Sequence, residues 1–111
     1  MFEIDARRAA RDIRLAADEM RDLARNAPPG PWQVTHGVDS VHLLALEGHE
    51  IAVLTGMWAT GTAKYLATVS PNVAYLLAEL LWLSESLVRK RELPSRVQAS
   101  LLALARAIRT P

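Results

Sequence analysis

Five side chains between residues 36 and 50 are the best candidates for metal or acid–base chemistry. His36, His42 and His49 are the only imidazoles, and Glu47 and Glu50 flank the last of them. A zinc site needs three or four such ligands that converge from fixed positions. We expect two of the histidines in or beside strands and His49 at the tip of a turn. This placement favours packed or solvated histidines, and we predict neither a metal nor a cofactor.

The motifs that commonly carry covalent or phosphate chemistry are missing. The chain has no cysteine, no Gly-x-Ser-x-Gly elbow and no phosphate-binding loop. Gly56 and Gly61 have the spacing that opens such a loop, but Lys64 does not directly follow Gly61. The acidic residues between 18 and 22 lie on a charged helix face that is exposed to solvent. Paired carboxylates need a concave, partly dry site to act as an acid and a base. We therefore predict that the protein is not an enzyme.

Basic residues gather in the last third of the chain, although the formal net charge is only +1. Such a cluster can contact nucleic acid, and it can also meet the negative end of a helix dipole. No aromatic residue interleaves with these bases, and single-stranded nucleic acid is commonly bound by stacking on aromatics. We favour the helix-dipole interpretation and keep a nucleic-acid-binding regulator as an alternative. The candidate basic patch comprises Arg89, Lys90, Arg91, Arg96, Arg106 and Arg109.

The segment 71–91 predicts a helix that is apolar on more than one face. One apolar stripe at helical spacing supplies a buried face. Tyr75, Ala78 and Trp82 extend the apolar surface to a second face. Either the other helices of the same chain cover both faces, or the second face meets another chain. We predict a homodimer through this second face. The first stripe comprises Val73, Leu76, Leu77, Leu80, Leu81, Ser84, Leu87 and Val88.

The remaining pattern predicts an α+β domain that spans residues 1–111. Apolar residues recur every three or four positions over 3–26, which predicts an amphipathic helix. Alternation between Trp32 and Thr55 predicts about three antiparallel strands, with a hairpin turn at residues 47–50. Helices are expected at about 62–69, 71–91 and 94–109. The fold class is thus an N-terminal helix, a small antiparallel β-sheet and C-terminal helices packed on one face.

Two local features define how these elements join. Ser70 precedes Pro71 at the start of the third helix, and its hydroxyl is expected to cap that helix. Trp32 follows a rigid run of prolines at residues 28–31. We expect its indole to anchor the core and its N–H to find a carbonyl.

Three blocks of the sequence together resemble a phage family. A Pro-Gly-Pro-Trp block follows a charged helix, a Glu-Gly hairpin comes next, and an Ala-Lys-Tyr-Leu-Ala-Thr-Val-Ser-Pro segment leads into a leucine-rich helix. In this combination, over about residues 20–85, the chain resembles the Ead-like proteins of lambdoid and other phages and prophages. The resemblance implies a mobile-element origin and an accessory role, and it implies no catalytic residues. The blocks lie at residues 29–32, 47–53 and 63–80.

These observations lead to one expected function and two alternatives. We expect a non-enzymatic phage or prophage accessory protein that binds a host or phage protein. The alternatives are an inhibitor that occludes a host defence complex of the CRISPR type, and the nucleic-acid-binding regulator. The Arg-rich start of the chain lacks the apolar run of a secretory signal. The most apolar window, 73–88, is short for a membrane span and contains two glutamates. We expect a protein of the host cytoplasm.

Overall fold

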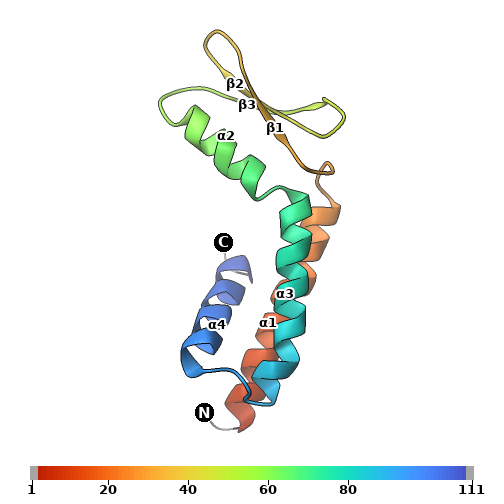
Figure 1. The fold of residues 1–111 in the computed structure, drawn as a ribbon, viewed down its shortest axis with the longest axis vertical. Coiled ribbons are helices and arrows are strands. Elements are labelled where there is room, and N and C mark those ends of the chain that lie inside the picture. The colour runs from red at the N-terminus through yellow and green to blue at the C-terminus, as the bar shows by residue number, and fades with distance from the viewer. Residues whose placement is uncertain (1–2, 110–111) are drawn as a thin grey trace. The chain divides into compact units, whose positions relative to one another are not determined.

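The computed structural model describes residues 3–109 and confirms the α+β class. It contains four helices and one three-stranded antiparallel sheet (Figure 1). The elements follow the predicted order, and their ends differ from the predicted ones by at most a few residues. They are α1 (Glu3–Arg25), β1 (Gln33–His36), β2 (Val41–Leu44), β3 (Glu50–Leu54), α2 (Ala59–Thr68), α3 (Pro71–Arg89) and α4 (Ser95–Arg109).

The chain contains two compact units. The helical unit contains the chain up to Asp22 and from Tyr75 onward, and the sheet unit contains Leu23–Ala74. Each unit has its own buried core. The predicted α+β class, with an N-terminal helix, a small sheet and packed C-terminal helices, is confirmed, and the buried residues form two cores.

The core of the helical unit joins α1, α3 and α4. Helix α1 contributes small apolar residues at helical spacing around Ile13, which is fully buried. Small side chains let neighbouring helices approach closely, so a narrow strip of α1 is enough to form this core. Arg109 on α4 also donates from Nη1 to Asp12 Oδ1 on α1 over 3.3 Å. The buried core residues are Ala9, Ala10, Ile13, Ala16, Ala17, Leu81, Val88 and Ala105.

In the sheet unit the strands follow one another in the order β1-β2-β3. Strand β2 alternates buried and half-buried residues, which is typical of a sheet with one covered face. The register shifts between Leu43 and Leu44, a β-bulge in the pairing with β3. The predicted hairpin between β2 and β3 is confirmed. Gly48 has a φ of 88°, and its N–H donates to the carbonyl of Ala45 over 2.9 Å.

Helix α2 covers the buried face of this sheet. Ala59 and Ala63 of α2 are buried against Val41 of β2, with Val34 and Leu54 packed around them. The small alanines allow the helix to lie close to the strands. The outer face of the sheet carries His42 and Glu50.

The junction before α3 departs from the predicted cap. The Ser70 hydroxyl donates to Asn72 Oδ1 over 2.6 Å instead of accepting a backbone N–H. The first turn is closed by the Ser70 carbonyl, which accepts from the N–H groups of Val73 and Ala74 at 2.9 and 3.1 Å. Ser70 and Pro71 are both buried. The helix begins at Pro71 as predicted, but Ser70 acts there through its backbone and through Asn72.

Trp32 is half-buried and belongs to neither core. Its Nε1 donates to the carbonyl of Pro28 over 2.8 Å, which confirms the predicted partner of the indole N–H. The predicted anchoring role is wrong in its location, because the ring closes the proline-rich turn instead of filling a core.

Candidate functional site

Four leucines on α3 form the most distinctive exposed surface of the helical unit. We call Leu76, Leu80, Leu83 and Leu87 the leucine stripe. Their spacing of four, three and four residues places all of them on one side of the helix. Large apolar side chains are usually withdrawn from water, so a continuous exposed set has to be explained. The exposed fractions are 66% for Leu76, 58% for Leu80, 57% for Leu83 and 38% for Leu87.

A neighbouring side of α3 supplies the core of the helical unit. Leu81 and Val88 are fully buried, and Ser84 is nearly so. The Ser84 hydroxyl donates to the carbonyl of Leu80 over 2.7 Å, which satisfies this polar group inside the helix. The apolar stripe predicted from the sequence is thus divided between two neighbouring sides of the helix. One part is buried in the chain and the other part is open.

The predicted interface residues on α3 do not share one environment. Ala78 has no exposed surface, so it belongs to the intrachain interior and is not available to a partner. Tyr75 and Trp82 are exposed by 40% and 51%, and they flank the leucine stripe. The exposed apolar surface is therefore centred on the leucines, with the two aromatic rings at its side.

The predicted basic patch is not brought together as one surface. Arg96 lies at the start of α4 while Arg109 ends that helix, which separates them by about 20 Å along its axis at ~1.5 Å per residue. Arg89 is paired with Glu85, and Arg109 with Asp12, each at 3.3 Å. Arg91, Lys90 and Arg96 are exposed near the connection between α3 and α4. Arg106 lies close to the last turn of α4.

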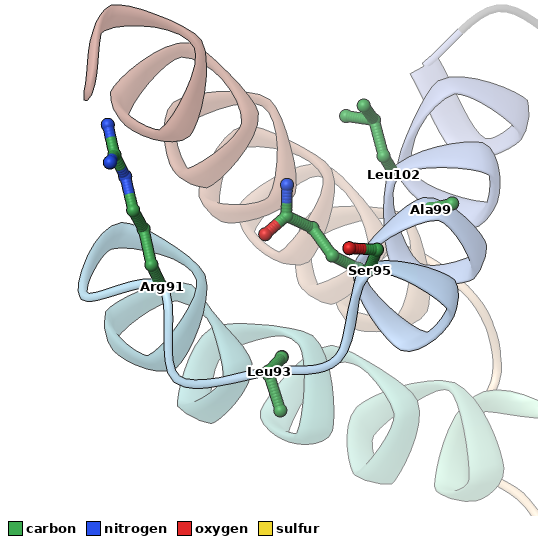
Figure 2. A pocket seen from close by; sticks show the side chains of 6 residues that line it. Arg91, Leu93, Ser95, Ala99 and Leu102 are labelled. Atoms are coloured by element: carbon green, nitrogen blue, oxygen red, sulfur yellow. The ribbon is translucent and has the colours of Figure 1, made fainter. Parts of the chain in front are cut away.

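A hollow of about 310 Å³ lies at this connection, within the helical unit. Arg91, Ser95 and the amide of Gln98 line it together with Leu93, Ala99 and Leu102 (Figure 2). One cation, one hydroxyl and one amide do not provide an acid–base pair. The hollow therefore offers no catalytic arrangement of its own.

Ser40, His42 and Glu50 form a chain of hydrogen bonds that the sequence analysis did not predict. Ser40 Oγ lies 2.9 Å from His42 Nε2, and His42 Nδ1 lies 2.6 Å from Glu50 Oε1. This is the order of groups in a Ser–His–acid triad. The bulge after Leu43 and the pairing of β2 with β3 bring Glu50 beside His42. The sequence contained only a weak signal for this cluster, because Glu50 lies eight residues beyond His42 in the chain.

The surroundings of this chain of hydrogen bonds favour a structural role. The side chains of His42 and Glu50 are exposed by 33% and 49%, so water screens the pair. Ser40 and His42 line none of the three hollows described in the molecule. A triad acts within a water-excluded site beside donors for the oxyanion. We interpret the three side chains as a polar cluster that links β2 to β3 on the outer face of the sheet.

The three histidines lie apart from one another on the sheet unit. Over residues 3–109, no group of three or more His, Asp or Glu side chains lies in an arrangement that could hold a metal ion. His49 is 3.6 Å from Glu47, and both side chains are about four-fifths exposed. His36 is exposed as well. The five candidates thus form two separate pairs, His42 with Glu50 and His49 with Glu47, and His36 stands apart from both.

Within residues 3–109, no single helix is long and apolar enough to cross a membrane. Helices α2 and α3 taken together have sufficient length and apolar composition, as a pair with a bend between them.

No family model matches this chain, and neither does any curated protein or solved structure. The resemblance to the Ead-like proteins stays a prediction.

Proposed function

We propose that this protein is a non-enzymatic protein-binding module whose contact surface is the leucine stripe of α3. The observation that carries the proposal is the exposure of four leucines at the spacing of a helix–helix seam. Apolar surface of this kind gains free energy when a partner removes it from water, at roughly 25 cal/mol per Å². The aromatic rings of Tyr75 and Trp82 beside the stripe are residue types enriched in binding anchors.

The charge distribution supports a protein partner over nucleic acid. The stripe itself carries no charge, and Glu79 is the only charged residue between Tyr75 and Trp82 on this part of α3. Nucleic-acid binding requires several cations that neutralise neighbouring phosphates. The basic residues of the helical unit are instead spread along α3 and α4, and two of them are paired with carboxylates.

For the biological setting, we propose a phage or prophage accessory protein that acts in the host cytoplasm on a host or phage protein. This setting is supported by the three sequence blocks that resemble the Ead-like proteins. Occlusion of a host defence complex is one form that such binding can take. The neighbourhood of the gene tests the setting independently of the surface: genes of phage structure or regulation on both sides support it, and a conserved metabolic operon contradicts it.

The binding surface is tested by charge substitution on the stripe. Leu83→Glu places an uncompensated carboxylate in the proposed contact, which a partner has to desolvate. Leu46→Glu is the matched control, because Leu46 is 56% exposed and lies outside α3. We expect proteins captured from a host lysate by the wild type and by Leu46→Glu to be lost with Leu83→Glu, at equal helix content by circular dichroism. Equal capture by all three proteins would contradict the proposal.

A further inference from the structure

We propose that the leucine stripe is covered by the leucine stripe of a second copy of this chain, with the two α3 helices antiparallel. This inference rests on the proposed function: the second copy occupies the stripe in the free protein, and a host or phage protein that binds the stripe displaces it. The spacing of four, three and four is that of the a and d positions of a heptad repeat. A helix with this repeat fits best against another helix with the same repeat, because side chains of one enter the gaps of the other. The chain itself presents such a helix.

The size of the surface agrees with a two-fold contact. The four leucines, Tyr75 and Trp82 together expose on the order of 600 Å², which reaches the upper limit of the largest apolar patch on a typical monomer. A stable interface of standard size buries about 800 Å² per partner. Residues around the stripe, such as Glu79 and Ser86, make up the difference. A two-fold axis uses the same patch on both copies, so no second surface is required.

Charge selects the antiparallel orientation. Arg89, Lys90 and Arg91 follow one another at the carboxyl end of α3. A parallel pair would bring six cations together at one end. In an antiparallel pair with Leu76 of one copy against Leu87 of the other, the two groups lie about 25 Å apart along the axis, at ~1.5 Å per residue. That separation exceeds the screening length of about 8 Å at physiological salt. The two helix dipoles are also antiparallel in this arrangement, which is electrostatically favourable.

Charge also selects the register. If Leu76 of one copy packed on Leu80 of the other, the two Glu79 side chains would flank the seam opposite each other and repel. If Leu80 packs on Leu83 of the second copy, Leu76 packs on Leu87 of the second copy and all four leucines are used. In this register the two Glu79 side chains are offset by about 7.5 Å along the axis, at ~1.5 Å per residue, and no longer face each other. We assign this second register.

The first experiment measures the oligomeric state by sedimentation at tens of micromolar. We expect a dimer for the wild type, a folded monomer for Leu80→Glu and a dimer for the control Leu23→Glu. Leu23 lies on α1 and is 59% exposed, against 58% for Leu80. A monomeric wild type, or a dimer that Leu80→Glu leaves intact, would overturn the inference. A monomeric wild type whose lysate capture still depends on the stripe would overturn the second copy as occupant and leave the proposed function standing.

The second experiment determines the orientation and does not require a destabilising charge. The chain has no cysteine, so single cysteines report unambiguously. We expect an oxidised mixture of Leu76→Cys and Leu87→Cys proteins to form a covalent heterodimer, with neither variant forming one alone. In the assigned register, two copies of residue 76 lie about 16 Å apart along the axis. A disulfide requires Cα atoms within about 7 Å. Covalent dimers of Leu76→Cys alone would show that the two copies of residue 76 face each other, which overturns the assigned arrangement.

Discussion

Arg91 follows the last turn of α3 in a backbone conformation that suits glycine. Its φ is 59°, and it is the only non-glycine residue with positive φ between residues 3 and 109. The N–H of Arg91 donates to the carbonyl of Val88 over 3.1 Å, and that of Glu92 to Leu87 over 2.9 Å. These two bonds form a Schellman motif with Arg91 at the position that glycine usually occupies.

We expect Arg91→Gly to stabilise the protein by about 1 kcal/mol. Glycine adopts the left-handed region without the steric cost of a Cβ, which is roughly 1–2 kcal/mol for other residues, and the greater freedom of the unfolded chain offsets part of the gain. Urea unfolding followed by circular dichroism measures the change. Arg91→Ala is the control, because it removes the same charge and keeps the Cβ. If alanine and glycine stabilise equally, the effect is one of charge and the backbone explanation fails.

Gly30 lies against the junction that begins α3. A Cβ at this position would meet Asn72 Oδ1 and would lie 2.9 Å from Ser70 Oγ. We expect Gly30→Ala to destabilise the protein by roughly 1–2 kcal/mol, because the hydrogen bond between Ser70 and Asn72 has to give way. Thermal unfolding measures this cost.

Two further variants make the explanation for Gly30 testable. In an Asn72→Ala background, Gly30→Ala should cost clearly less, because the bond is already absent. Gly61→Ala is the matched control: Gly61 lies in α2 with open space around its Cα. There we expect a gain of roughly 0.5–1 kcal/mol from helix propensity. A gain at both glycines would show that the crowding at Gly30 has no energetic consequence.

At the scale of elements, helix and strand positions could be predicted because periodicity is a local property. The repeat of small apolar residues around Ile13 predicted α1 almost to its last residue. The alternation between Trp32 and Thr55, with Gly48 at the turn, predicted three strands in the observed order. The predicted start of α2 was three residues late, because Trp58 at its amino end forms no side-chain cap that the sequence could reveal.

The environment of each face of α3 could not be predicted in the same way. When a helix is apolar nearly all round, its sequence pattern does not indicate which side faces the core. The pattern of α3 therefore does not show which leucines pack against α1 and α4. Tyr75 and Trp82 were predicted on an open face and are exposed, whereas Ala78 between them is buried. The contacts of Ser40 with His42 and Glu50 also depend on strand register and a bulge, which a single sequence specifies poorly.

At the scale of the whole molecule, the net charge is only +1 and the arginines are dispersed, which disfavours binding to nucleic acid. We expect no specific binding to duplex DNA at physiological salt, because few phosphates can be neutralised together. An electrophoretic shift assay at micromolar protein checks this. Submicromolar binding that weakens in an Arg96→Gln, Arg106→Gln double variant would contradict it and favour the regulatory alternative.

The division of the chain into two units has a consequence for the order in which the protein folds. The sheet unit uses one continuous stretch, Leu23–Ala74, whereas the helical unit joins the two ends of the chain. Ile13 therefore packs with Leu81 and Ala105 across a long loop, and the entropy of closing such a loop has to be overcome before the contact forms. During synthesis, α1 is made before the sheet unit, and α3 and α4 are made after it. We expect the sheet unit to complete its contacts while the apolar strip of α1 is still open, because the helices that cover this strip have yet to be made.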